Sequence, residues 1–246
     1  FGVGGDNIEV DIDTLVITGG VTGELKLETS GDLILDAVTT TTGGFEVKLT
    51  GANDTLTLMG TVDVGQDQNF HAEAGTVRVG DEVLLDASAG NSVSAVFRGD
   101  EVDFTSGNSN SIRFAGGGGS GTLTIEPLSL NTNIEIGANT ILGSMNLDAG
   151  DMNSIGQLAG GTANWDRVIF GREDGTGTVT TTGDLTFADP VLIQAAGPGG
   201  RLVDNVNITS EATSATYPGL HYRGSGHTTE MMGNKNLAAA FLLEDN

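Results

Sequence analysis

The densest group of side chains that could carry chemistry lies near the C-terminal end of the chain. It contains tyrosines, histidines, an arginine and a glutamate: Tyr217, His221, Tyr222, Arg223, His227 and Glu230. On a helix, His227 and Glu230 would share one face, but zinc hydrolase motifs require a second His four residues after the first, and position 231 is Met. Because no nucleophile or third ligand accompanies the pair, we expect packing or a subunit contact here rather than acid–base catalysis.

Aspartates beside or near glycine recur along the chain, and a calcium ion would use such carboxylates. They are Asp6, Asp54, Asp67, Asp81, Asp100, Asp174 and Asp184. The segment 51–56, Gly-Ala-Asn-Asp-Thr-Leu, resembles the calcium-binding nonapeptide, but that motif needs tandem copies so that adjacent turns share an ion, and no tandem copy follows. We expect these side chains to bond the backbone of their own turns. Ca²⁺ is the one cofactor left open, without an assigned ligand set.

An enzymatic alternative is a polysaccharide lyase or depolymerase built on a β-helix. Such enzymes combine converging carboxylates, often with calcium, with a basic residue that removes the proton next to a uronate. The basic residues that alternate with apolar ones, and should therefore point outward, are Lys26, Lys48, Arg78, Arg98 and Arg113. Whether any of them meets a carboxylate depends on the register between strands. His71 stands alone on an expected strand, where a solvent-facing or hydrogen-bonded side chain is more common than a catalytic base.

Composition narrows the classes of partner. The chain has 246 residues, with 10 Lys and Arg against 33 Asp and Glu, which gives a formal charge of -23. Such a surface repels nucleic acid phosphates and anionic lipid head groups. No apolar run is long enough to insert into a membrane, and the absence of cysteine removes disulfides and thiol catalysis. We expect neither nucleic acid nor membrane as a partner, no catalytic or cofactor-binding residue, and no enzymatic activity.

The elements that must position these residues are short runs of alternating apolar and polar residues. The apolar residues at period two are Ile8/Val10/Ile12, Leu25/Leu27, Leu33/Leu35, Phe45/Val47/Leu49, Leu56/Leu58, Val62/Val64, Val77/Val79, Val102/Phe104, Ile112/Phe114, Leu123/Ile125 and Ile134/Ile136. This alternation buries one face of each strand and leaves the other wet. Short Gly-rich spacers separate the runs, and the first, ITGGVTGE around Thr18–Gly20, is expected to be a turn.

The clearest stretch of this kind is 165–196. It holds four β-like runs, Arg167–Phe170, Gly177–Thr181, Asp184–Phe187 and Val191–Gln194, separated by turn-forming Gly, Asp and Pro. No run is long enough to bury itself, so each must stack on the next, as in repeat architectures. We therefore predict an all-β fold, a right-handed parallel β-helix. An antiparallel β-sandwich is the alternative, because its strands have a similar spacing.

The segment VIFGREDGTGTVTTTGDLTFADPVLIQA resembles a unit that recurs in large filamentous-haemagglutinin-like exoproteins of bacteria. The matching positions are Gly171, Arg172, Asp174, Gly175, Gly177, Phe187, Asp189, Pro190 and Ile193. The preceding stretches, 121–137 and 145–156, are also similar, so the resemblance is best over 118–197. It implies a secreted or cell-surface, right-handed β-helix used for adhesion or surface scaffolding, and we expect surface glycans among the partners. It implies no particular ligand.

The C-terminal part of the chain differs from the rest. Residues 138–166 are expected to form a looser coil or side loop, and sustained alternation ends after Ser210. We therefore expect a solenoid over 1–210, and over 211–246 a C-terminal cap or a segment that contacts another subunit. Its run LAAAFLL could form a single helix or strand, too short to span a bilayer.

Solenoid ends must be capped or joined, because they expose unpaired strand edges. We expect Leu237, Phe241, Leu242 and Leu243 to form an assembly contact, an apolar stripe on an otherwise acidic chain. The partner would be the chain itself, head to tail, or neighbouring repeats of a larger chain, and a non-closing contact of this kind builds a filament. The overall prediction is a structural or adhesive extracellular module; the alternatives are a lyase or depolymerase, or a carbohydrate-binding module.

Overall fold

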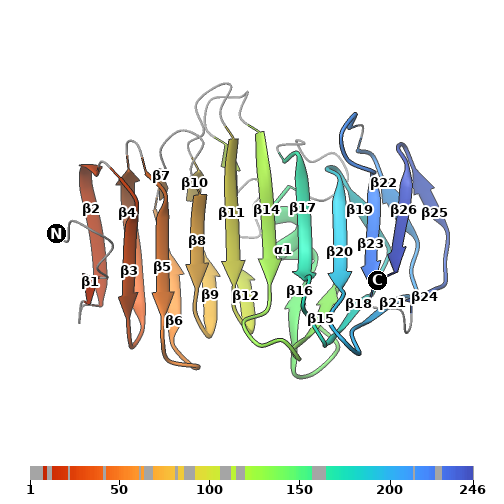
Figure 1. Ribbon diagram of the computed structural model, residues 1–246, viewed down its shortest axis with the longest axis horizontal. Coiled ribbons are helices and arrows are strands. Elements are labelled where there is room, and N and C mark those ends of the chain that lie inside the picture. Colours follow the sequence, from red (N-terminus) through yellow and green to blue (C-terminus); the bar gives the residue numbers. More distant parts are fainter. Residues whose placement is uncertain are drawn as a thin grey trace.

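The protein is an elongated stack of parallel β-strands in the computed structural model (Figure 1). The structure describes residues 8–9, 13–21, 23–40, 43–60, 62–63, 69–80, 83–85, 92–105, 112–114, 120–156, 165–212, 214–224 and 229–245. Every strand pairing in this part of the chain is parallel. The predicted β-helix is confirmed, and the antiparallel sandwich is excluded.

One long sheet runs the whole length of the stack. Its strands, in spatial order, are β1 (Ile8–Glu9), β3 (Leu25–Thr29), β5 (Phe45–Leu49), β8 (Asn69–Glu73), β11 (Ser92–Arg98), β14 (Ser120–Glu126), β17 (Arg167–Arg172), β20 (Val191–Ala195), β23 (Leu220–Gly224) and β26 (Phe241–Asp245). These strands run down the near side in Figure 1, and the chain returns upward behind them while advancing from N- to C-terminus. The coil is therefore right-handed.

The sheets that form the other walls of the coil differ between the N-terminal and C-terminal halves of the stack. In the N-terminal half the order is β12 (Glu101–Phe104), β9 (Thr76–Val79), β6 (Thr55–Leu58), β4 (Leu33–Thr40), β7 (Val62–Asp63), β10 (Val83–Leu85) and β13 (Ile112–Phe114), with β2 (Thr14–Val21) also on β4. Strand β4 joins two walls, because its Leu33–Leu35 part pairs with β6 and its Val38–Thr39 part with β7.

The C-terminal half has two separate sheets besides the long one. The first contains β16 (Ser144–Leu147), β15 (Asn133–Ile136), β18 (Thr178–Thr181), β21 (Arg201–Asp204) and β24 (Thr229–Met231). The second contains β19 (Leu185–Phe187), β22 (Ile208–Ser210) and β25 (Lys235–Leu237). The four runs expected within 165–196 are all strands, β17 to β20, and they fall on three different sheets.

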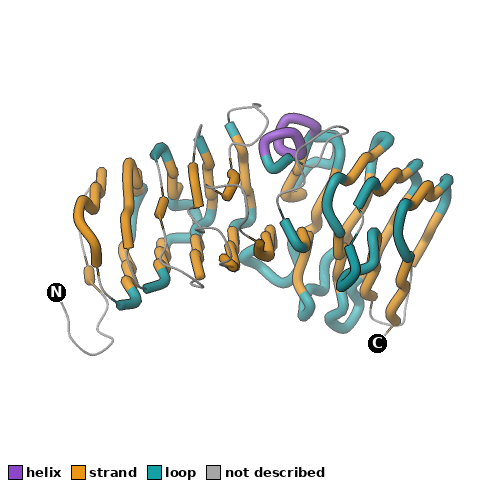
Figure 2. The backbone as a smooth tube through the Cα atoms, turned by 90° about the horizontal axis from the view of Figure 1, so that it is seen from above, coloured by secondary structure: helices purple, strands orange, loops and turns teal. Residues whose placement is uncertain are grey.

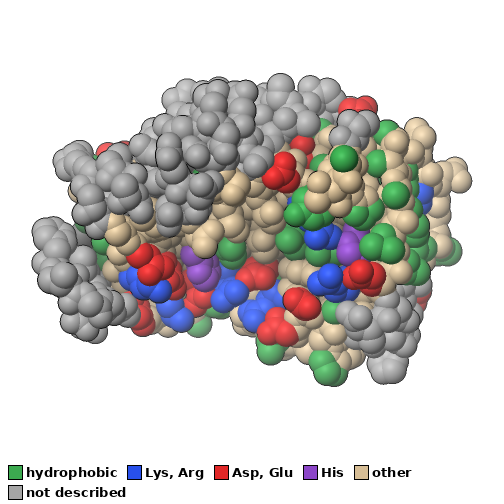
Figure 3. Space-filling model, turned by 45° about the horizontal axis from the view of Figure 1, so that its top comes forward, with side chains coloured by type: hydrophobic (Ala, Val, Ile, Leu, Met, Phe, Trp, Pro, Cys, Tyr) green, Lys and Arg blue, Asp and Glu red, His purple; other side chains and the backbone are tan. Residues whose placement is uncertain are grey.

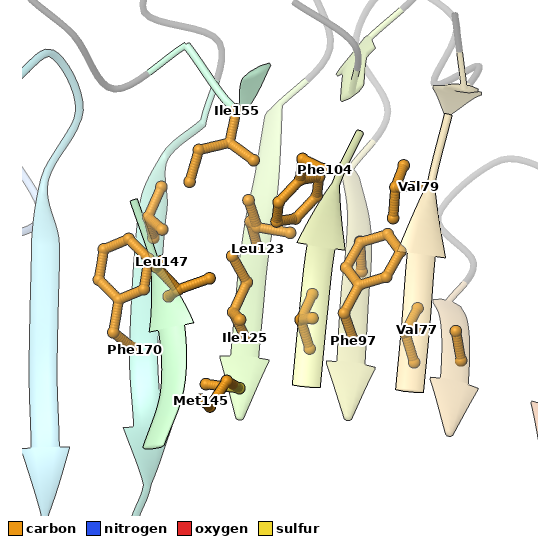
Figure 4. Packing of buried hydrophobic residues seen from close by; sticks show 14 of the residues in the cluster. Val77, Val79, Phe97, Phe104, Leu123, Ile125, Met145, Leu147, Ile155 and Phe170 are labelled. Atoms are coloured by element: carbon orange, nitrogen blue, oxygen red, sulfur yellow. The ribbon is translucent and has the colours of Figure 1, made fainter. Parts of the chain in front are cut away.

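The core consists of side chains stacked in rows along the coil axis. On the long sheet, Phe45, Phe70, Ala95, Leu123, Val168, Val191 and Leu220 follow one another in register. Phenylalanine rings also pack on one another: Phe70 and Phe97, on successive coils, have ring centroids 5.5 Å apart, and Phe97 and Phe104, on two walls of the same coil, have centroids 6.0 Å apart. Figure 4 shows this packing in the middle of the stack. Inward apolar residues at period two, as the alternation predicts, make up this core.

The segment 138–166, expected to be loose, contains β16 and the short helix α1 (Ala149–Ser154) before a stretch outside the described residues. Helix α1 has a capping box in which Asp148 accepts from the Asp151 N–H and Asp151 accepts from the Asp148 N–H. The other Asp151 oxygen accepts a 2.8 Å bond from the Phe104 N–H at the end of β12. The helix therefore lies at the junction of the two halves of the stack (Figure 2). Its Asp151 side chain is bonded to β12, which is the end strand of the N-terminal sheet.

One expected turn is wrong. Thr18–Gly20 lies inside β2, which continues to Val21. The pairing of β2 with β4 shifts register between Ile17 and Val21, as in a β-bulge. Glycine inside a strand pattern commonly marks such a bulge, so the Gly-Gly pair distorts the ladder without ending the strand.

The expected division at residue 210 does not coincide with a break in the sheets. Strands β23 to β26 extend the same three ladders, so they form the last coil of the described chain. The run LAAAFLL is also divided, because Leu237 ends β25, Phe241 begins β26 and the alanines between them form the corner. It is therefore not a single helix or strand. In Figure 1 this coil lies at the right-hand end of the stack.

Candidate functional site

The C-terminal end of the long sheet is an open edge within the described chain. Strand β26 pairs with β23 on one side, and no described strand lies on the other. Phe241 and Leu243 stand opposite Leu220 and Tyr222, which are buried core residues. Yet 40% of Phe241 and 46% of Leu243 is exposed. These two side chains occupy interior positions that a further coil would cover.

The structure brings three of the four predicted contact residues to the same end of the interior. Leu237 continues the inward row of Phe187 and Ser210 and packs, partly buried, against the core. Leu242 is the exception, because it stands opposite His221 on the outer face of the sheet. The grouping of Leu237, Phe241 and Leu243 follows from stacking, and their contact with a partner stays a prediction.

Just inside this apolar end, the interior carries a polar network around Asp204. The Asp204 carboxylate is 1% exposed and accepts from Thr181 Oγ1 at 2.8 Å and from Tyr222 Oη at 2.6 Å. Lys235 Nζ lies 2.9 Å from Asp204 Oδ2 and donates to the Val206 carbonyl at 2.8 Å. Burial, together with the Asp204 carboxylate, raises the pKa of Tyr222, so that its hydroxyl remains a donor. Sequence reasoning missed this network.

The outer face of the long sheet carries a row of alternating charges. Glu28, Lys48, Glu73, Arg98 and Glu126 follow one another on successive strands in register. Lys48 Nζ is 2.9 Å from Glu73 Oε1, Arg98 Nη1 is 3.1 Å from Glu73 Oε2, and Arg98 Nε is 2.7 Å from Glu126 Oε1. Although burial opposes it, Lys48 and then Arg98 hold the pKa of Glu73 below its usual value. Figure 3 shows the resulting band of basic and acidic side chains.

The register of the long sheet confirms that Lys26, Lys48 and Arg98 point outward. Lys26 pairs with Glu46 at 3.0 Å in the neighbouring row of the same face, and Arg78 lies 3.8 Å from Asp103 on the β9–β12 wall. The side chain of Arg113 lies outside the described part of the chain. The register between strands therefore places these basic residues beside carboxylates, with which they form salt bridges.

The row is interrupted at Gly171, and a groove of about 510 Å³ lies there. Gly171 follows Phe170, the partner of Ile125, so it takes the place next to Glu126. Its backbone has φ +92°, and a Cβ at this position would lie 2.1 Å from the Gln194 carbonyl oxygen. Beyond it the row resumes with Gln194, Arg223 and Glu244. The residues lining the groove are Arg98, Thr124, Glu126, Ile169, Arg172, Glu173, Asp174 and Gln194.

The predicted polar group of 217–230 is divided between the two faces of the sheet. Tyr222 points inward, whereas His221 and Arg223 point outward. Arg167 Nη2 lies 2.6 Å from His221 Nδ1, which must accept, so the ring proton is on Nε2, 3.1 Å from Glu244 Oε2. Burial, then the charge of Arg167, lowers the pKa of His221 despite the opposing effect of Glu244.

The remaining members of that group do not form the expected helical pair. Glu230 lies on strand β24 and pairs with Arg201 at 2.8 Å, while His227 lies outside the described residues. Tyr217 contacts Arg167, whose guanidinium carbon is 5.1 Å from the centre of the ring. His71 also favours its neutral form, because burial, followed by the positive charge of Arg98, lowers its pKa.

The glycine-associated aspartates that are described serve turns and neighbouring coils. Asp54 accepts from the Gly51 and Gly31 N–H groups, and Asp100 accepts from Ser129 and Thr132 of the following coil. Asp184 accepts from Asn207, and Asp174 from Arg172. Asp6, Asp67 and Asp81 lie outside the described residues. Within the described ranges, no three His, Asp or Glu side chains gather in a way that could hold a metal ion.

Two carboxylates, Asp151 within α1 and Glu101 on β12, lie in an unfavourable environment. Burial, followed by the charges of Asp151 and Asp103, raises the pKa of Glu101 to about 7. Burial also raises the pKa of Asp151 to about 6, against the two backbone N–H bonds that it accepts. Both groups therefore titrate near neutral pH at the junction of the two halves.

Comparisons with known proteins add no relative to this picture. No family model matches the chain, and neither a curated protein nor a solved structure matches it. In the part of the chain that the structure describes, no helix is long and apolar enough to cross a bilayer. The resemblance to filamentous-haemagglutinin-like exoproteins stays a prediction, and the β-solenoid fold is what the structure adds to it.

Proposed function

We propose that this chain is a non-enzymatic structural and adhesive module of the cell surface or extracellular matrix, which assembles head to tail into a filament. The observation that carries the proposal is the exposure of Phe241 and Leu243 at interior row positions of the last strand. Burying such side chains under another coil would be favourable, and pairing the free edge of β26 would satisfy its unpaired backbone groups.

At the opposite end of the stack, the described edge strands are β1 on the long sheet and β2 on the neighbouring wall. Leu15 and Ile17 of β2 are apolar residues that pack on the core but are only partly buried. A parallel ladder keeps its direction from coil to coil, so the C-terminal edge of one molecule can pair with the N-terminal edge of the next. The contact is heterologous and does not close on itself, and contacts of this type generate filaments. We therefore assign a second copy of the chain as the occupant.

The experiment replaces Phe241 and Leu243 together with Asp and compares the assembly state with that of the unchanged chain. Electron microscopy of the unchanged chain should show filaments of stacked coils, and the variant should show single short rods. Leu142→Asp is the control, because Leu142 is 98% exposed and lies away from the end of the stack. Filaments that persist in the double variant would contradict the proposed contact.

The lyase or depolymerase alternative would use the outer-face groove, where arginines and carboxylates meet. Arg172, however, bonds Asp174 through both Nε and Nη2 and donates from Nη1 to the carbonyls of Pro127 and Leu128. A guanidinium held in this way is poorly placed to remove or donate a proton, which favours a structural role for the chain over the lyase or depolymerase. Turnover of uronate-containing or neutral polysaccharides that is lost on changing Arg98 or Glu126 would support the enzyme instead.

A further inference from the structure

The groove at Gly171 has the features of a ligand site on the side of the filament, away from its ends. We propose that it binds a short segment of an uncharged oligosaccharide. It forms because the charged row along the long sheet lacks a side chain at one position, while the flanking coils keep theirs. The volume is about 510 Å³, within the range of small-molecule sites.

The floor of the groove is moderately apolar. Thr124 and Ile169 are outward residues of adjacent strands, paired in register and half-buried. The methyl group of Thr124 and the side chain of Ile169 offer a surface for the C–H face of a sugar ring. Gln194, which also lines the groove, donates from Nε2 to the Gly171 carbonyl at 3.1 Å, and this bond orients its side-chain amide.

The rim supplies hydrogen-bonding groups that suit hydroxyl groups. Glu126, Glu173 and Asp174 are acceptors, and Arg98 and Arg172 are donors with planar, fixed geometry. Arg172 and Asp174 hold each other in a bidentate pair, with contacts of 2.8 Å and 3.0 Å, so this part of the rim is preorganised. Glu173 is mostly exposed and lies 3.6 Å from Arg223. Sugar hydroxyls both donate and accept, and can use both kinds of group.

The charge of the groove selects against acidic glycans. The lining holds the two arginines and three carboxylates named above, and each arginine is already paired with a carboxylate. The chain as a whole carries a formal charge of -23. A uronate or sulfate would meet net repulsion, whereas an uncharged sugar would not. The ligand class is therefore a neutral or N-acetylated oligosaccharide.

The dimensions suggest a segment of a few sugar units. The lining comes from four adjacent strands, β11, β14, β17 and β20, and from the turn after β17. At about 4.8 Å between strands, these four span roughly 14 Å. A groove of this length suits a trisaccharide, and the site would recur once per molecule along a filament. Binding does not depend on assembly, because the groove is formed by a single chain.

The test is calorimetric titration of the full chain with cellotriose, maltotriose, tri-N-acetylchitotriose and trigalacturonate. Thr124→Tyr fills the floor, and Glu173→Ala removes an exposed rim acceptor. Thr57→Tyr is the matched control, because Thr57 is also a half-buried outward threonine, but on the β6 wall. Circular dichroism checks that each variant folds.

At least one uncharged trisaccharide should bind, and trigalacturonate should bind at least about tenfold more weakly. Thr124→Tyr should weaken binding by about tenfold or more and Glu173→Ala by about threefold, with Thr57→Tyr unchanged. If Thr124→Tyr does not fold, the comparison of trisaccharide binding by Glu173→Ala and by Thr57→Tyr decides the outcome. The proposal is overturned if no uncharged trisaccharide binds, if trigalacturonate binds as tightly, or if the groove variants bind like the control.

Discussion

Lys235 Nζ lies 2.9 Å from the buried Asp204 Oδ2, so an ion pair closes the interior near the C-terminal end of the solenoid. The lysine comes from the last coil and the aspartate from the coil before it. Removing one partner of such a pair leaves a buried charge without compensation, which costs more than the pair itself contributes. The pair therefore fixes how the last coil sits on the preceding one.

We predict that Lys235→Met lowers the free energy of unfolding by about 2–4 kcal/mol, because Asp204 would keep only neutral hydrogen-bond donors. Chemical denaturation followed by circular dichroism measures the change. Lys26→Met is the control, since Lys26 pairs with Glu46 on the solvent-exposed face, where an ion pair contributes little to stability. Equal losses in the two variants would show that the buried pair has no special role.

Glu101 gives a prediction about pH. Its pKa is raised to about 7 in the folded chain, from an ordinary value of 4.5. The folded state therefore holds this proton more tightly than the unfolded state, and the stability linked to it is full below about pH 4 and lost as the pH rises through 7. Ionised Glu101 should destabilise the junction beside α1 at alkaline pH.

We expect Glu101→Gln to stabilise the protein by roughly 1–2 kcal/mol at pH 8, after allowance for solvent screening, and to have little effect at pH 4. Unfolding curves at both pH values test this. Glu46→Gln, which removes a carboxylate from the exposed pair with Lys26, should show no such gain at pH 8. A benefit for Glu101→Gln that is as large at pH 4 as at pH 8 would argue against titration as the cause.

Gly171 gives a prediction about the stability of the sheet beside the groove. Its φ is +92°, and an added Cβ would lie 2.1 Å from the Gln194 carbonyl oxygen, so the neighbouring strand must shift. Gly199 has a similar φ of +87° with nothing within 4 Å of the added atom. Gly199→Ala should cost about 1 kcal/mol, for backbone strain alone. Gly171→Ala should cost at least about 2 kcal/mol more, as in other overpacked sites, when both are measured by thermal unfolding.

The sequence predicted the strands well where each one could be judged by itself. Leu25 and Leu27, or Phe45 and Val47, show their inward face through alternation alone. Features that depend on contacts between neighbouring coils were harder to predict from the sequence. Asp204 stands at an inward position two residues after Leu202, and only its register with Thr181 and its contacts with Tyr222 and Lys235 explain why a carboxylate is tolerated there.

The groove was missed for the same reason. Gly171 reads as a turn glycine next to Arg172 in the sequence, and its place in a row of charged side chains emerges only when β14, β17 and β20 are aligned. Likewise, Thr18–Gly20 resembles a turn locally, but pairing with β4 keeps it within a strand. The C-terminal coil lacks clear alternation, because its interior mixes Met231 and Leu237 with the polar Lys235.

Sedimentation velocity over a range of concentrations, from about 1 µM to about 100 µM, tests head-to-tail assembly most directly. The unchanged chain should form larger species as concentration rises, because Phe241 and Leu243 then find the N-terminal coil of another molecule. The Phe241→Asp/Leu243→Asp variant should remain a folded monomer throughout, and Leu142→Asp should assemble like the unchanged chain. An unchanged chain that stays monomeric over the whole range, or a double variant that assembles equally well, would contradict the account.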